Sequence, residues 1–220
     1  ENIAAYVREI HQGSDPKVMY NGVNTSRFNP NQEPDNLEFF NGDCPTFFCL
    51  SRLLFKKGID ILLEAAQILD DKAVDAEIVI AGSGPDEADV KAQASKLTNV
   101  KVLGHIEEQS LPKYYAAATA SLFTSKTGEA FPTLTVLEAL ASGTPVIATN
   151  INERMEGITD GHNGFLVQPG DVSELASAIR RLARNPGLAN EMGNNARIIA
   201  TNKFDIEENV DRLEDMYQSL

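Results

Sequence analysis

The stretch TASLFTSKTGEAFPTLTVLEALASGTPVIAT, residues 119–149, begins and ends with a short apolar run. These runs, residues 119–123 and 145–149, are almost continuously apolar, as strands are when both faces of a sheet are covered. Between them, TLTVLEALAS predicts a helix that stops at Gly143, with Pro145 just beyond it. A strand, a helix and a second strand in this order indicate one βαβ unit of a parallel sheet.

The same pattern extends over most of the chain. Four further apolar runs are found at residues 46–50, 77–81, 99–103 and 164–167. Helical stripes separate them; in one, Ile59, Leu62, Leu63 and Ala66 lie at positions i, i+3, i+4 and i+7. The sequence therefore predicts an α/β fold, a Rossmann-like doubly wound parallel sheet of about six strands.

The chain ends in a helical region without strands. Three helices are predicted there, at residues 171–184, 188–200 and 206–219. Asp171 followed by Glu174 is a plausible cap for the first of them. At the other end, residues 1–16 read as a lead-in helix and KVMY, residues 17–20, as an edge strand. We expect residues 1–220 to form a single domain, with a polar, proline-containing loop at 29–45.

Composition excludes several classes of function. The 220 residues carry 19 Lys and Arg against 32 Asp and Glu, a net charge of −13, which disfavours a nucleic-acid binder. No apolar run approaches the roughly 20 residues of a spanning helix, and the start ENIAAYVREIHQ lacks a signal-peptide pattern, so a cytoplasmic location is expected. Cys49 reads as a buried thiol. The scattered histidines, together with only two cysteines, predict no metal site.

The residues that follow the strands predict the chemistry, because ligands of an open parallel sheet bind beyond the carboxyl ends of its strands. Arg52 and Lys57 follow the run at 46–50. Glu129 and Glu138 lie in and after the loop that follows residue 123, where a helix begins at Thr133 and Leu134. Cations and a helix N-terminus favour a diphosphate, and a carboxylate accepts hydrogen bonds from a vicinal diol. A nucleoside diphosphate carrying a sugar is the predicted ligand.

Each of these features also has a simpler interpretation. Taken alone, Arg52 and Lys57 also fit surface charges at the start of a helix. GSGPDE, residues 82–87, lacks the third glycine of a dinucleotide fingerprint, so a tight turn with Asp86 and Glu87 at a helix start is favoured. Taken alone, His105 reads as a structural or solvated residue.

A series of motifs resembles a known family. These motifs are NGVN (21–24) with Phe28, SRLLFKKGIDILLEA (51–65), AGSGPDE (81–87), NVKVLGHI (99–106), GEAFPTLTVLEALASGTPVIAT (128–149), GHNGFLVQPGD (161–171) and a last helix with Tyr217. In this order they resemble the C-terminal, donor-binding half of retaining glycosyltransferases of group 1 (family 4), in the GT-B class. The resemblance runs from about Val18 to the end of the chain.

The resemblance implies roles for individual residues. Arg52 and Lys57 would hold the donor diphosphate, and Glu138 would accept the ribose hydroxyls. The pattern also places Gly104 and His105 among the residues that bind the nucleotide. The backbone around four consecutive residues would line the sugar and the phosphates: Phe131, Pro132, Thr133 and Leu134.

The spacing of the two glutamates departs from the family pattern. In that pattern the first glutamate of an E-x7-E motif contacts the transferred sugar, but eight residues separate Glu129 from Glu138. A spacing of seven would place Ala130 at the first position. We favour Glu129, with one extra residue between Thr133 and Val136, and keep loss of the first glutamate as the alternative. The family's usual glycine before the arginine is Ser51 here.

For function, the resemblance implies transfer of a hexosyl group from a UDP- or GDP-sugar to an acceptor hydroxyl, with retention and without a metal or a resident cofactor. The N-terminal acceptor-binding domain is absent from this chain, so the isolated chain is expected to be inactive. The acceptor, a glycan, a lipid or a small molecule, and any peripheral membrane contact would belong to that missing half.

Three other functions fit parts of the sequence. A sugar-nucleotide epimerase can share the architecture and would turn over its substrate without an acceptor. A degenerate transferase half acting as a binding module is supported only by the shifted glutamate spacing. A dehydrogenase is disfavoured by the incomplete glycine motif.

Overall fold

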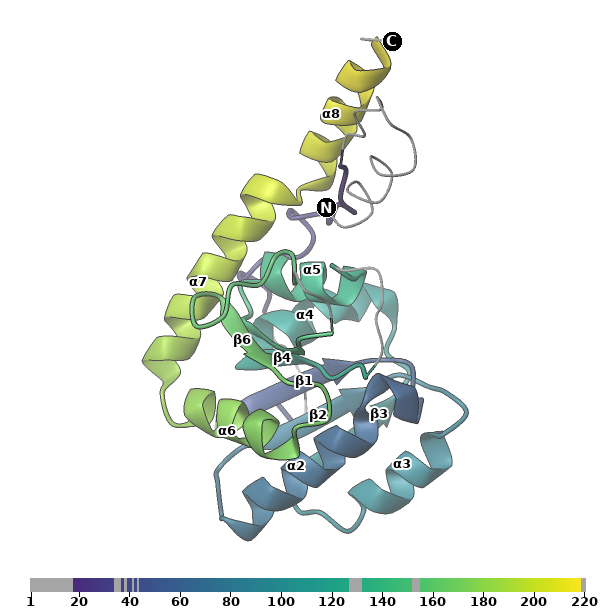
Figure 1. Cartoon of the computed structure of the whole chain (residues 1–220), viewed down its shortest axis with the longest axis vertical. Helices are drawn as coiled ribbons and strands as arrows, with labels where there is room; N and C mark the ends of the chain where they lie inside the picture. The colour runs from purple at the N-terminus through teal and green to yellow at the C-terminus, as the bar shows by residue number, and fades with distance from the viewer. Residues whose placement is uncertain are drawn as a thin grey trace.

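The computed structural model describes residues 18–33, 37, 39–40, 42, 44–126, 132–151 and 155–218. Within these residues, six strands form one parallel sheet with helices on both faces, as the sequence predicts (Figure 1). The strands are β1 (Thr46–Leu50), β2 (Glu77–Ala81), β3 (Val100–Gly104), β4 (Ala120–Phe123), β5 (Val146–Thr149) and β6 (Gly164–Val167). The three runs that open with Asn99, Thr119 and Pro145 each enter the sheet one residue late.

The order of the strands across the sheet is β3-β2-β1-β4-β5-β6. The chain moves outward from β1 to β3, crosses back to β4 beside β1, and then moves outward on the other side. All neighbouring strands pair in parallel. The direction of winding therefore reverses between β1 and β4, and in such sheets the crevice beyond the strands at this point is where ligands bind.

Helices cover both faces of the sheet, and two long helices close the chain. The helices are α2 (Ile59–Asp71), α3 (Glu87–Ala94), α4 (Leu111–Ala117), α5 (Leu134–Ala141), α6 (Val172–Ala183), α7 (Pro186–Lys203) and α8 (Ile206–Gln218), with short 3-10 turns η1 (Phe55–Lys57) and η2 (Glu108–Ser110). The three predicted closing helices are confirmed. None of the helices in the described part of the chain is long and apolar enough to cross a bilayer.

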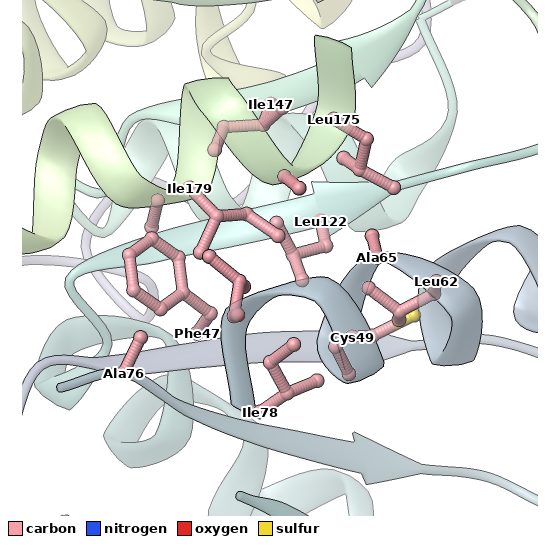
Figure 2. Close-up of a cluster of buried hydrophobic side chains, with 14 of the residues drawn as sticks. Phe47, Cys49, Leu62, Ala65, Ala76, Ile78, Leu122, Ile147, Leu175 and Ile179 are labelled. Carbon is pink, nitrogen blue, oxygen red and sulfur yellow. The ribbon is translucent and has the colours of Figure 1, made fainter. Parts of the chain in front are cut away.

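One face of the sheet packs against α2 and α6. Alternate strand residues point to this face, among them Phe47 and Cys49 of β1, and they meet Leu62 of α2 and Ile179 of α6 (Figure 2). All four are at most 1% exposed. Cys49 is the buried thiol that its sequence environment predicts, and burial raises its pKa to about 12.

The opposite face packs against α4 and α5 and is rich in aromatic residues. Phe48 of β1 points there, with its ring centroid 5.3 Å from that of Tyr115 on α4. Phe40, from the predicted polar loop, packs edge-on against Phe48 at 6.1 Å. Part of that loop is thus anchored in the core, which its proline-rich and polar composition does not reveal.

Local signals at the helix ends are largely confirmed. The Asp171 carboxylate accepts the N–H of Glu174 at 2.9 Å, as predicted for an N-cap. Gly143 follows the end of α5 with φ of 71°, a value that favours glycine. The edge strand expected at residues 17–20 is wrong for its described part, because residues 18–20 form no strand; nearby, Val23 makes only an isolated bridge to Asp205. The lead-in helix at residues 1–16 lies outside the described residues.

We expect the core between the sheet and α6 to contribute strongly to the stability of this domain. Ile179→Ala removes a side chain that is 0% exposed and should lower the free energy of unfolding by about 2–5 kcal/mol. Ile198→Ala on α7 is the matched control, since Ile198 is 56% exposed and its loss should change stability by less than about 0.5 kcal/mol. Urea unfolding followed by circular dichroism measures both; equal effects would contradict this assignment of the core.

Candidate functional site

A cleft of about 420 Å³ opens at the point where the winding of the sheet reverses. Its floor is formed by the carboxyl ends of β1 and β4, and its walls by the segments that follow these strands and by the start of α5. The lining residues are Cys49, Leu50, Ser51, Arg52, Leu54, Lys56, Lys57, Leu122, Phe123, Thr124, Ser125, Thr133, Leu134 and Thr135. The cleft therefore lies where a doubly wound sheet binds its ligand.

The loop after β1 is held in place by the loop after β2. The N–H of Leu53 donates to the carbonyl of Ser83 at 2.9 Å, and the N–H of Phe55 donates to the Asp86 carboxylate at 2.7 Å. Asp86 precedes α3 as predicted, but its side chain makes no cap bond there. Gly84 permits this contact, because a Cβ on it would lie 2.3 Å from the carbonyl oxygen of Leu53. The loop that carries Arg52 thus rests on a fixed base.

The same loop is joined directly to the end of β4. Gly58 has φ of 72°, and a Cβ on it would lie 1.8 Å from the carbonyl oxygen of Thr124. The Thr124 hydroxyl donates to the carbonyl of Lys57 at 3.0 Å, and the N–H of Lys126 donates to that of Lys56 at 3.0 Å. These contacts close the cleft on the side of α2.

The first turn of α5 forms the other wall. Thr133 has an extended backbone and makes no side-chain cap bond to the helix. The first N–H groups of a helix have no partner within it and carry its positive dipole end. With Thr133, Leu134 and Thr135 lining the cleft, this wall can receive an anion.

Arg52 and Lys57 both line this cleft, as predicted. Arg52 is exposed and Lys57 is half-buried. Lys56, which the sequence reading did not single out, joins them. A protein of net charge −13 thus gathers three cations beside a helix N-terminus, an arrangement suited to a diphosphate.

Glu138 lies one turn into α5 and outside the cleft lining. The pKa of its carboxyl is raised to about 7, mainly by burial. The Tyr115 O–H and the Arg27 charge lower this pKa and the Glu108 charge raises it, and each of these effects is smaller than that of burial. The Tyr115 hydroxyl is buried and has no hydrogen-bond partner within 3.5 Å among the described residues, although it lies close enough to Glu138 to act on it. Burial, then the charge of Glu138, raises the pKa of Tyr115 well above its ordinary value.

The remaining predicted residues fall into three groups. Pro132 is buried just before the start of α5. Gly104 and His105 lie at the carboxyl end of β3, the edge strand, which is separated from β1 by β2, and they are not part of the cleft lining. Glu129 and Phe131 lie outside the described residues, so the position of the first glutamate stays a prediction.

Besides Lys56, further residues around the site were not found by sequence reasoning. Thr124 and Ser125 carry no motif, although their position directly after β4 is a usable signal. Tyr115 resembles any core residue of an apolar helix. Arg27 is 111 positions away from Glu138 in the sequence, and no local pattern connects them. Across the described ranges, no group of three or more His, Cys, Asp or Glu residues is placed to hold a metal ion.

Comparison with known proteins identifies the family of this domain. The family model for glycosyl transferases group 1 matches residues 32–198. A GDP-mannose-dependent alpha-(1-6)-phosphatidylinositol monomannoside mannosyltransferase of Mycolicibacterium smegmatis is 32% identical over 185 residues, which cover 78% of this chain and 48% of the relative. The chain spans about half the length of the first relatives it matches.

Solved structures give the same result. The crystal structure of Anabaena Alr3699/HepE in complex with UDP and glucose superposes with a TM-score of 0.82 at 25% identity, covering 98% of this chain and 60% of that one. The C-terminal domain of the group 1 family protein LpcC from Francisella tularensis superposes with a TM-score of 0.72 at 26% identity. It covers 84% of this chain and is itself covered completely.

We expect the Asp86 carboxylate to stabilise the loop that carries Arg52. Asp86→Ala leaves the N–H of Phe55 without its acceptor and should cost about 1–2 kcal/mol in the free energy of unfolding. Asp86→Asn keeps an acceptor oxygen and should stay closer to the wild type. Thermal unfolding of both variants measures the difference, and an alanine variant as stable as the wild type would contradict the role of this bond.

We also expect Glu138 to make stability depend on pH. Its pKa in the folded protein is about 7 against an ordinary value of 4.5, so between these values the folded state holds a proton that the unfolded chain has released. The free energy of unfolding therefore falls as pH rises through this window. Relative to Glu138→Gln, the wild type should lose about 1–3 kcal/mol between pH 5 and pH 8. Urea unfolding at both pH values tests this, and a difference that does not change with pH would contradict it.

Proposed function

Because this chain belongs to the glycosyl transferases group 1 family, we propose that it is the part of a retaining hexosyltransferase that binds the nucleotide-sugar donor. The observation that carries the proposal is the cleft between β1 and β4, where Arg52 and Lys57 lie beside the first turn of α5. These groups would neutralise the donor diphosphate and stabilise the negative charge that develops on it as the bond to the sugar breaks. The donor is then a substrate, and no resident cofactor is needed.

We assign the ribose to Glu138. An ionised carboxylate accepts hydrogen bonds from both hydroxyls of a vicinal diol, whereas a protonated one keeps less acceptor capacity. Glu138 lies one helical turn beyond the wall that would receive the phosphates, so phosphates and ribose can bind along α5. Gly104 and His105 also lie where a strand ends, at the carboxyl end of β3. They would contact the part of the nucleotide on the other side of the ribose from the phosphates.

Two donors fit the comparisons. HepE was solved with UDP and glucose, and the mycobacterial relative is named as dependent on GDP-mannose. Since both lie at low identity to this chain, we leave the base to experiment and propose a UDP- or GDP-hexose.

For the reaction, we propose front-face substitution with retention. The bond between the sugar and the phosphate breaks, and the departing phosphate oxygen takes the proton of the acceptor hydroxyl as the new glycosidic bond forms. This chain would contribute charge stabilisation through Arg52, Lys57 and the α5 N-terminus. A covalent intermediate on Glu129 is the second mechanism, and it requires that Glu129 reach the anomeric carbon. The acceptor would be bound outside this domain.

Calorimetric titration of this chain with UDP, GDP and ADP tests the donor site. We expect saturable binding of UDP or GDP, weakened about tenfold or more in Arg52→Ala and Glu138→Ala, because each loses a charged contact to the ligand. Arg184→Ala is the matched control, since Arg184 is an exposed arginine at the end of α6 and outside the cleft. Wild-type affinity in Arg52→Ala would contradict the assignment of the diphosphate.

A further inference from the structure

Arg27 connects two segments that are far apart in the sequence. One guanidinium nitrogen donates to the Glu108 carboxylate at 2.8 Å, and the other donates to the backbone carbonyl of Glu108 at 2.7 Å. A guanidinium that makes two such bonds is held in one orientation. It fixes the η2 turn, which follows β3 and residues Gly104 and His105, against the loop of residues 24–28.

The loop that carries Arg27 is itself rigidly held. The Asn24 side chain accepts hydrogen bonds from the N–H of Arg27 at 2.8 Å and from the Ser26 hydroxyl at 2.7 Å. Arg197 of α7 donates to the carbonyls of Thr25 and Phe28, and also to that of Ala141, the last residue of α5. The Arg197 guanidinium therefore connects the loop that carries Arg27 to α5, the helix on which Glu138 lies.

Contacts continue from Arg27 towards Glu138. The Arg27 guanidinium lies 5.1 Å from the centre of the Phe28 ring, and that ring packs edge-on against Tyr115 at 6.1 Å. The Tyr115 hydroxyl in turn lies close enough to the Glu138 carboxyl to lower its pKa. Among the described residues, the groups that act on this carboxyl are Tyr115 from α4, Glu108 from η2 and Arg27 from the loop.

We propose that Arg27 is a positioning residue of the donor site, which clamps the turn after β3 through Glu108 and keeps a positive charge beside the carboxyl of Glu138. The inference rests on the proposed binding of ribose by Glu138. It assigns Arg27 a task that no local motif reveals: to favour the ionised form of a half-buried acid that must accept two hydroxyls. Arg27 itself need not touch the ligand.

The proposal predicts opposite shifts in the pKa of Glu138 when either residue of the Arg27–Glu108 ion pair is replaced. Arg27→Gln removes the positive charge and leaves that of Glu108, so the protonated form of Glu138 is favoured. Glu108→Gln removes the negative charge and leaves Arg27 unneutralised, so the ionised form is favoured. A role limited to holding the two segments together would move both variants in the same direction, since both lose the same ion pair.

Titration of the Glu138 carboxyl carbon by NMR, with uniformly ¹³C-labelled glutamate and assignment by Glu138→Gln, tests this without any ligand. The midpoint should rise by about half a pH unit in Arg27→Gln and fall in Glu108→Gln, a modest size because both side chains are partly exposed. Arg27→Lys keeps the charge and should leave the midpoint near that of the wild type. No change in either variant, or changes of the same sign, would overturn the proposal.

Calorimetry with UDP and GDP then connects the clamp to binding. For the nucleotide that the wild type binds, Arg27→Gln should weaken affinity about twofold at pH 7, and much less at pH 8.5, where Glu138 is ionised in both proteins. Equal loss at both pH values would overturn the role of the charge. If the titration midpoints move as expected but neither nucleotide binds the wild type, the donor site is what fails, and the electrostatic coupling of Arg27 to Glu138 stands.

Discussion

The close approach of the backbone at Gly58 to the carbonyl of Thr124 is the contact on which the candidate site depends. It occurs where β1 and β4 lie side by side and the winding of the sheet changes direction. Any side chain at Gly58 would separate the two loops, because its Cβ would lie 1.8 Å from the Thr124 oxygen. The loop after β1 can therefore place Lys57 against the end of β4, and the cleft has one continuous wall. The positions of the cationic side chains at the cleft therefore depend on how the backbone packs at Gly58 and Thr124, and not only on which side chains the loop carries.

Most of the fold could be predicted from the sequence because the decisive signals are local. Short apolar runs alternate with helical stripes, and three of the six runs match their strands residue for residue. The Asp171 cap and the glycine stop at Gly143 depend on neighbouring residues only, and both are found where expected. The edge strand expected at residues 17–20 was wrong for its described part, residues 18–20, for the opposite reason. Valine and tyrosine in KVMY are common in strands, but a strand needs a partner, and residues 18–20 pair with none of the six described strands.

The site was predictable only as far as strand ends determine it. Arg52, Lys57 and the start of α5 follow directly from the rule that strand carboxyl ends share an edge. Arg27, Glu108 and Tyr115 act on Glu138 from three other segments, and their meeting depends on how α4, η2 and the loop at 24–28 pack. Contacts between segments so far apart in the sequence produce no periodic pattern of residues along the chain. The apolar surroundings of Glu138 did indicate that its carboxylate needs partners, but not which residues supply them.

The environment of Glu138 places two requirements in opposition. In the proposed site, burial near Tyr115 would hold the carboxyl in position for the ribose. The same burial raises its pKa to about 7 and favours the protonated form, which accepts fewer hydrogen bonds. A bound diphosphate would add negative charge nearby and favour protonation further. Among the described residues, the charge of Arg27 opposes protonation of Glu138. Arg52 and Lys57 line the cleft instead and would neutralise the diphosphate itself. Neutralisation of the phosphates in the cleft and the charge of Arg27 would thus both serve the proposed ribose contact, because a carboxyl that is protonated in the complex keeps less capacity to accept hydrogen bonds.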